Sequence, residues 1–350
     1  MMQGRGCGLW LVAGVALCAF AAGADHVATY RTPARDWQRA SLTGNGTIGA
    51  MARGEVADET ISLSHCKLYL PEPGETPPTL VGFPRRNPAD YNSRDGFMAA
   101  CDLKISTPIR GVKNYVRGTD FDTGECFVEA DDAAGVRYRR RVVALRPANV
   151  IAVKIEDAGR RDPLCALAGI APSGRGDLGA FTRGIRRIVS EPDYYRCEFK
   201  NENPWNALIG YEVLLTQRRS DAARTEVFVA IEPLLKGQDS NRAALAARLA
   251  AAAEKGYDAL VADNAAYLSE MMGRVAFALE GPANAADIVR NFDAGRYNIF
   301  SSTGGDHIPN LQGLWAGTWS APWCASFTVN GNLPCAIAFF DRGRTPELNE

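Results

Sequence analysis

The feature that most constrains the fold is a change of pattern at Asp239 and Ser240. Residues 25–235 predict one short strand after another, because β-branched and aromatic residues are broken by Gly, Pro, Asn and Asp at short intervals. Residues 241–255 are instead almost continuous strong helix formers, and Ser240 is suited to cap such a helix. We therefore expect a large β-rich unit followed by helices, with two domains as the default for 350 residues.

The strand pattern is clearest in four segments, residues 59–70, 136–145, 149–156 and 225–231. Residues 136–143 read VRYRRRVV, which holds too many arginines for a strand buried on both faces. We expect this strand in an antiparallel sheet with one face in water, and hence a β-sandwich. Residues 71–88 are rich in Gly and Pro and predict a long surface loop.

Helices are predicted beyond residue 240. The first covers residues 241–255, and the second covers residues 257–277 with one buried face formed by Leu260, Tyr267, Leu268 and Met271. A further short helix is predicted over residues 287–292, leading into the block that starts at Gly295.

The N-terminus predicts a secretory signal. Arg5 supplies a positive region, residues 9–20 an apolar region, and residues 22–24 (Ala-Gly-Ala) a cleavage site of small residues. We expect cleavage after Ala24, export, and no membrane span in the mature protein, because the apolar run is shorter than the roughly 18 to 20 residues that cross a bilayer. Cys18 leaves a lipoprotein open, although the preceding residue is bulkier than such processing prefers.

Charge and cysteine spacing narrow the range of partners. Lys plus Arg (39) nearly balances Asp plus Glu (40), so the net charge of −1 gives no long-range attraction to nucleic acid, and a neutral or weakly polar substrate fits better. The nine cysteines include two in the signal, and the others lack the close spacing of a zinc or redox site. We expect no metal and no cofactor, mostly buried thiols, and at most one or two disulfides.

A block near the C-terminus is rich in Trp, Gln, Asn and Thr. It reads GRYNIFSS at 295–302, PNLQGLW at 309–315 and TVNGN at 328–332. Loops of this composition suit a pocket that stacks on a pyranose ring and hydrogen-bonds its hydroxyls. The block indicates the opening of a sugar-cleaving site, with a glycan as the substrate.

With two earlier blocks, this segment resembles the glycoside hydrolases of family 95, the inverting α-L-fucosidase and α-L-galactosidase group. LTGNGTIGAM at 42–51 resembles the family's GNG and GAM block, and ISLSHCKLY at 61–69 resembles the strand that follows it. The resemblance runs from about Trp37 to Asn332. It implies a mainly β N-terminal sandwich (a supersandwich), an α-helical linker, and the start of an (α/α)6 barrel that carries the active site.

The resemblance also implies a division of the chain. We expect a signal peptide at 1–24, a β-sandwich domain at 25–235, a helical linker at 236–280 and the beginning of the barrel at 281–350. Twelve helices of roughly 11 to 12 residues each need far more residues than follow position 281, so we expect the barrel to be incomplete.

The resemblance implies the site residues as well. Inverting hydrolysis needs a carboxylic acid and a carboxylate base on opposite sides of the bond. Asn330 and Asn332 match the family's Asn-X-Asn pair, which holds the attacking water beside the base. Thr328 lies where members vary between His and Thr, and the Thr form resembles those that prefer α-L-galactosides. Further candidate substrate-binding residues are Gln312, Trp315 and Trp323.

Alternatives to these roles remain at the level of sequence. Asn330-Gly331-Asn332 is also typical of a turn, and Gly331 replaces the family's usual Ile. Each Trp fits a core position, and His65 and His307 are too isolated to form a ligand set. The family's acid and base lie farther along the barrel, so we assign neither and expect little or no turnover from these 350 residues.

Two functions follow. The first is an exported, metal-independent glycosidase, or the N-terminal part of one. The alternative is a catalytically inactive relative or fragment that acts as a glycan-binding or structural β-sandwich protein.

Overall fold

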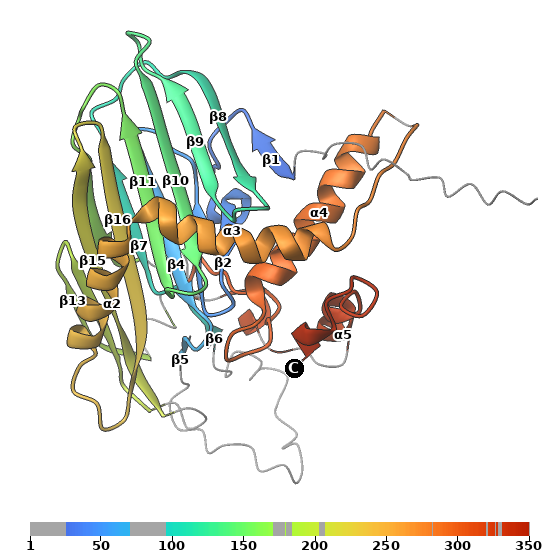
Figure 1. The fold of residues 1–350 in the computed structure, drawn as a ribbon. Coiled ribbons are helices and arrows are strands. Elements are labelled where there is room, and N and C mark those ends of the chain that lie inside the picture. Colours follow the sequence, from blue (N-terminus) through green and yellow to red (C-terminus); the bar gives the residue numbers. More distant parts are fainter. Residues whose placement is uncertain are drawn as a thin grey trace, which may run out of the picture.

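A computed structural model describes residues 26–70, 96–170, 179, 184–202, 207–281, 283–319, 321–325, 327 and 331–349. The predicted signal peptide and the predicted loop at 71–88 lie outside these residues. Figure 1 shows two layers of strands with helices on one side. The prediction of a mainly β-sandwich is confirmed.

The larger sheet has nine strands, and every neighbouring pair is antiparallel. Its spatial order is β1 (Val27–Tyr30), β8 (Lys113–Asp120), β9 (Cys126–Asp131), β10 (Arg137–Leu145), β11 (Val150–Asp157), β16 (Arg224–Leu235), β15 (Leu208–Asp221), β14 (Tyr194–Phe199) and β13 (Ile185–Ser190). The predicted strands at 136–145, 149–156 and 225–231 are present here as β10, β11 and β16, because alternating apolar residues need a core on one face. The strand predicted at 59–70 is instead two strands, β4 (Asp58–His65) of the smaller sheet and β5 (Tyr69–Leu70), because a turn at residues 66–67 interrupts it.

The smaller sheet has five antiparallel strands in the order β12 (Leu164–Ala168), β7 (Cys101–Ser106), β4 (Asp58–His65), β3 (Ile48–Ala52) and β2 (Ser41–Gly44). A short 3-10 helix, η1 (Trp37–Arg39), precedes β2, and β5 (Tyr69–Leu70) pairs with β6 (Gly96–Phe97) apart from both sheets. Apolar residues from the facing sides of the two sheets form the main core, with Ile61, Leu103 and Val153 fully buried.

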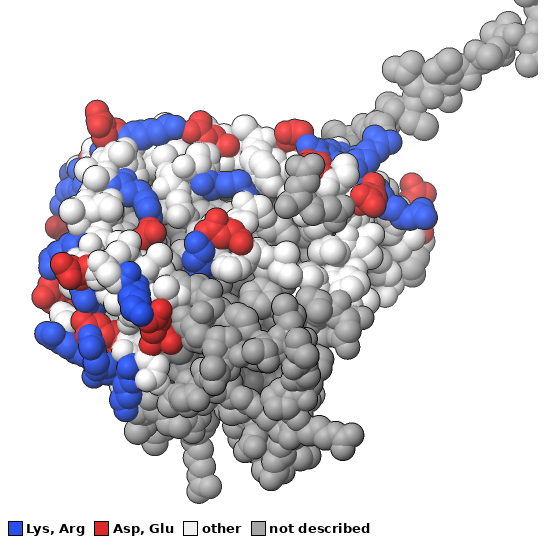
Figure 2. Space-filling model, turned by 90° about the horizontal axis from the view of Figure 1, so that it is seen from below, with Lys and Arg blue, Asp and Glu red and all other residues white. Residues whose placement is uncertain are grey.

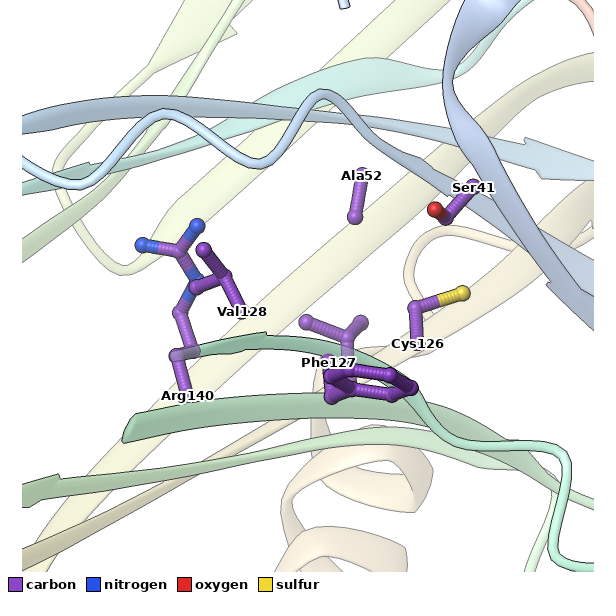
Figure 3. Close-up of a pocket in the computed structure, with 7 residues that line it drawn as sticks. Ser41, Ala52, Cys126, Phe127, Val128 and Arg140 are labelled. Carbon is purple, nitrogen blue, oxygen red and sulfur yellow. The ribbon is translucent and has the colours of Figure 1, made fainter. Parts of the chain in front are cut away.

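The arginine-rich strand β10 departs from the prediction at one position. Arg139 is exposed, as expected for a wet face, but Arg140 is only 1% exposed and forms an ion pair with buried Glu59. Its Nη2 also donates to the Glu55 carbonyl oxygen at 2.8 Å. Figure 3 shows Arg140 reaching from the larger sheet into the space between the layers, beside Val128 and a small cavity of about 10 Å³. The prediction that this strand's arginines face water was therefore wrong for Arg140.

Two helices cover the outer face of the larger sheet. Leu245 and Leu249 of α2 (Arg242–Lys255) and Leu260 of α3 (Tyr257–Gly273) pack with sheet residues such as Phe228. Three of the four residues predicted to form the buried face of α3, Leu260, Leu268 and Met271, are buried. The helix cap lies at Asn241 rather than Ser240, although Ser240 Oγ accepts a hydrogen bond from the Arg242 N–H at 3.1 Å.

The next helix, α4 (Ala285–Ser302), is longer than predicted and includes the whole GRYNIFSS block. Asp293, Arg296, Tyr297 and Phe300 recur at helical spacing and are buried, so packing offsets the low helix propensity of Gly295. Tyr297 and Phe300 contact Phe121, Leu268 and Met272. Shorter elements follow, η3 (Pro322–Ala325), α5 (Asn332–Ile337) and η4 (Pro346–Asn349).

The helices after residue 281 do not establish a barrel, so the start of the barrel and the division into domains stay predictions. Within the described residues, none of the helices has the length and apolarity needed to cross a bilayer. Cys66, Cys101, Cys126, Cys165 and Cys197 are buried free thiols, as the composition predicts, and Cys335 is free and exposed.

Candidate functional site

The GNG motif forms the tight turn between β2 and β3. Asn45 Oδ1 accepts hydrogen bonds from the backbone N–H groups of Thr47 (2.9 Å) and Ile48 (2.8 Å). Asn45 Nδ2 donates to the Leu145 carbonyl oxygen at 3.0 Å, so the same side chain ties the turn to the end of β10. This buried amide therefore links the two sheets.

The glycines of this hairpin allow residues 301–315 to pack directly against its backbone. The Gly46 N–H donates to the Ser301 carbonyl oxygen at 2.9 Å, and a Cβ at Gly46 would lie 2.3 Å from the Thr303 carbonyl oxygen. A Cβ at Gly49 would lie 2.9 Å from the indole nitrogen of Trp315. No side chain fits at such distances, so the GNG motif is a docking surface for residues 301–315, which form the docked segment.

Trp315 belongs to this docked interface. Its Nε1 donates to the Thr43 carbonyl oxygen at 2.9 Å, and its ring packs with Met51, Cys66 and Leu314. With 5% of its surface exposed, Trp315 offers little area to a ligand. Its position fits the core alternative that the sequence left open.

Arg146 fixes the point where the chain leaves α4. Its guanidinium donates to the carbonyl oxygens of Phe300 (2.6 Å) and Thr303 (3.0 Å), and it lies over the Tyr267 ring at 4.5 Å. A cation at this end of a helix compensates the unpaired carbonyl groups. No local sequence pattern indicates this role, because the two hydrogen bonds join residues more than 150 positions apart.

A pocket of about 190 Å³ opens beside the docked segment. Its described lining residues are Pro309, Asn310, Leu311, Asn332, Leu333 and Ala336. Asn332 is the first residue of α5 and is exposed. Two amide side chains and a set of apolar groups therefore share one small hollow, a combination typical of sites for small polar ligands.

The Asn310 amide is held from two sides. Its Oδ1 accepts from the Gln312 N–H at 2.7 Å, and its Nδ2 donates to the Tyr69 hydroxyl oxygen at 2.9 Å. Gln312 is half-buried in the turn that joins Asn310 to Gly313, whose N–H donates to the Asn310 carbonyl oxygen at 2.8 Å.

Aromatic rings surround this amide. Tyr69 packs against Phe97 and Phe327 with ring centroids 5.3 and 5.4 Å away, and Phe327 lies 6.1 Å from His307. The Tyr69 hydroxyl also donates to the Ala325 carbonyl oxygen at 3.3 Å. Burial raises the pKa of Tyr69 well above its ordinary value, so the phenol stays protonated.

Ionisable groups near the aromatic rings are neutral or paired. Lys67 forms an ion pair with Asp306, and its hydrogen bond lowers the pKa of that carboxyl. Burial, with a smaller effect of Lys67, lowers the pKa of His65 to about 3, and its Nδ1 accepts from the Lys67 N–H at 3.1 Å. Burial also lowers the pKa of His307. Both imidazoles are therefore neutral at pH 7.

The face of the molecule shown in Figure 2 has no large patch of charges of one sign among the described residues. On the face in Figure 2, Lys and Arg lie among Asp and Glu. No carboxylate is among the described residues that line the pocket. Within the same part of the chain, no group of three or more His, Cys, Asp or Glu residues is placed to hold a metal ion.

The predicted site residues are only partly described. Asn330 and Thr328 lie outside the described residues. Asn332 is a described lining residue of the pocket, whereas Gln312 is connected to it only through its backbone N–H, which donates to Asn310 Oδ1. Trp323 is 76% exposed on η3. Their roles stay predictions, while Asn310, Tyr69 and Arg146 are residues that sequence reasoning did not single out.

Part of the chain matches a known protein family. Residues 29–88 match the family described as "Glycosyl hydrolase family 65, N-terminal domain". This match covers the GNG block and the strand after it. This part of the chain is therefore similar to glycoside hydrolase N-terminal domains, and the match does not support the finer resemblance to family 95.

A solved structure gives the same fold. The protein called "Putative kojibiose phosphorylase from human microbiome" superposes with a TM-score of 0.53 at 10% identity, over 82% of this chain. The chain spans 43% of the length of that protein. No curated protein matches the chain. At this identity the likeness concerns the fold alone.

Proposed function

We propose that the chain is the N-terminal, sugar-recognising part of a glycosidase that removes terminal α-L-fucosyl or α-L-galactosyl residues with inversion. The observation that carries the proposal is the pocket in which Asn332, of the Asn-X-Asn motif, lies beside Asn310 of the PNLQGLW block. The match of residues 29–88 to a glycosyl hydrolase N-terminal domain supports the same class of chemistry.

In this proposal the amides of Asn330 and Asn332 orient the attacking water. An amide oxygen accepts a hydrogen bond from the water but does not take its proton. A carboxylate base therefore has to deprotonate the water, and a carboxylic acid has to protonate the leaving oxygen. The described pocket lining holds neither. We assign both groups to parts of the polypeptide outside the described residues.

Thr328 is the proposed selector between the two sugars. L-Galactose carries a hydroxyl on C6 that L-fucose lacks, and a small hydroxylated side chain leaves room and a hydrogen-bond partner for it. The proposal therefore favours α-L-galactosides.

The test uses the longest polypeptide that the gene encodes, with aryl α-L-fucoside and aryl α-L-galactoside as substrates. Proton NMR of the first product should show the β-anomer, because water attacks opposite the leaving group. Asn332→Ala should lower kcat by about 10- to 1,000-fold with little change in KM, since the water is held only for the reaction.

Asn284→Ala is the matched control, because Asn284 is exposed at the start of α4 and its side chain makes no capping hydrogen bond. The α-anomer as first product, or full turnover in Asn332→Ala, would contradict the proposal. Sugar binding without any turnover would favour the glycan-binding alternative.

A second candidate is phosphorolysis of an α-glucoside, favoured by the matches to a family 65 N-terminal domain and to a protein named as a kojibiose phosphorylase. Phosphate would then replace water as the attacking group. Incubation with kojibiose and inorganic phosphate separates the two, because only a phosphorylase forms a sugar phosphate that depends on added phosphate.

We also propose export with removal of residues 1–24. N-terminal sequencing of the mature protein should begin at Asp25. A first residue of Cys18 would instead indicate a lipoprotein.

A further inference from the structure

We infer that Asn310 binds a sugar hydroxyl in the pocket and that Tyr69, from the N-terminal β unit, positions its amide. The inference rests on the proposed function, because it takes the ligand to be a neutral monosaccharide. Asn310 belongs to the docked segment, whereas Tyr69 is in β5, more than 200 residues earlier. Recognition of the sugar by the docked segment would then depend on a side chain of the β-sandwich region.

The contacts of Asn310 leave half of its amide available. A side-chain amide has two N–H donors and two acceptor lone pairs. One N–H is used by the Tyr69 oxygen (2.9 Å) and one lone pair by the Gln312 N–H (2.7 Å). One donor and one acceptor therefore remain on a half-buried residue that lines the pocket. Adjacent sugar hydroxyls offer the complementary acceptor and donor.

The packing and hydrogen bonds of Tyr69 hold that amide in one orientation. Its ring is fixed between Phe97 and Phe327, and its hydroxyl hydrogen is directed at the Ala325 carbonyl oxygen (3.3 Å). The phenol oxygen accepts from Asn310 Nδ2 at 2.9 Å, and an inverted amide would turn its own acceptor oxygen toward this phenol oxygen instead. Because Tyr69 is 9% exposed, it acts through Asn310, as a positioning residue.

The rest of the pocket matches a sugar ring. Pro309, Leu311, Leu333 and Ala336 supply apolar surface for ring C–H groups, and the described lining carries no charge. The volume of about 190 Å³ lies below the roughly 300–1,000 Å³ of pockets for drug-sized ligands, which suits one monosaccharide.

The test measures binding of methyl α-L-fucoside, methyl α-L-galactoside and methyl α-D-glucoside to the 350-residue chain by NMR titration. Asn310→Ala should weaken binding by about 10-fold and Tyr69→Phe by about 3- to 10-fold, the range expected for one hydrogen bond. Tyr115→Phe should leave affinity unchanged. It is the matched control, because Tyr115 also donates to a backbone carbonyl, that of Gly54 at 2.7 Å, away from the pocket.

A second readout separates recognition from folding. Among monodeoxy derivatives of the bound sugar, the one that lacks the hydroxyl contacted by Asn310 should bind equally well to the parent and to Asn310→Ala. A general loss of structure would instead weaken all derivatives alike. This comparison holds even if Tyr69→Phe fails to fold.

The outcomes distinguish failure of this inference from failure of the proposed function. If the parent binds a sugar and both variants bind it equally well, or if no deoxy derivative equalises parent and Asn310→Ala, this inference is overturned and the proposed function stands. If the parent binds none of the three sugars, both are overturned.

Discussion

Replacing Gly46 by Ala should detach residues 301–315 from the β-sandwich and lower the free energy of unfolding by an amount that follows from the local geometry. Gly46 has φ +86°, a conformation that costs an L-residue about 1–2 kcal/mol. An added Cβ would also lie 2.3 Å from the Thr303 carbonyl oxygen and 2.7 Å from the Gly305 nitrogen. Such overpacking costs about 1–3 kcal/mol. The free energy of unfolding should therefore fall by about 2–5 kcal/mol.

Gly135→Ala provides the control for backbone strain alone. Gly135 has φ +83°, close to that of Gly46, but no atom lies within 4 Å of an added Cβ. This variant should lose only about 1–2 kcal/mol. The difference of about 1–3 kcal/mol between the two variants isolates the close approach of residues 303–305 to the hairpin.

Urea unfolding followed by circular dichroism measures the stability of each variant, and tryptophan fluorescence reports on undocking. Trp315 is buried in the interface, so its emission should shift to longer wavelength in Gly46→Ala and not in Gly135→Ala. Equal losses of stability in the two variants would refute the idea that the GNG turn is a docking surface.

Two further perturbations test the interior of the sandwich. The pKa of His65 is lowered to about 3, so the folded state favours the neutral ring. The stability that this provides is present above the unfolded pKa of about 6.5 and is lost as the pH falls toward 3, so urea unfolding should show a loss of about 2 kcal/mol between pH 8 and pH 5. His65→Gln should remove this pH dependence, and an unchanged pH profile in that variant would contradict the assignment. Glu59→Gln should cost about 3–5 kcal/mol by leaving the buried Arg140 charge unpaired, and a loss below about 1 kcal/mol would show that the pair is not buried as described.

The sandwich was predictable because its signal is local. Alternating apolar residues in segments such as 149–156 and 225–231 specify strands with one or two covered faces, and these strands appear as β11 and β16. The change to helix after Ser240 is local as well, since residues 241–255 are strong helix formers.

The errors have longer-range causes. Arg140 is buried because Glu59, on the other sheet, neutralises it, and nothing near Arg140 in the sequence announces that partner. Helix α4 continues through Gly295 because burial of Tyr297 and Phe300 outweighs a local preference.

The candidate site was predicted only in outline. Its residue types predicted a sugar pocket, and the structure places Asn332 in a small pocket beside Asn310. The roles of Tyr69 and Arg146 depend on contacts across more than 150 residues, which no local pattern contains. Asn45 and Gly46 are recognisable in the sequence as part of a motif. The structural role of Gly46, which is to let residues 301–315 pack against the turn, becomes visible only in three dimensions.

A crystal structure of the chain soaked with methyl α-L-galactoside tests the central claim most directly. The account predicts one sugar ring in the hollow between residues 309–311 and α5, with a hydroxyl within hydrogen-bond distance of the Asn310 amide. A sugar bound at another surface, with this hollow empty, would contradict it.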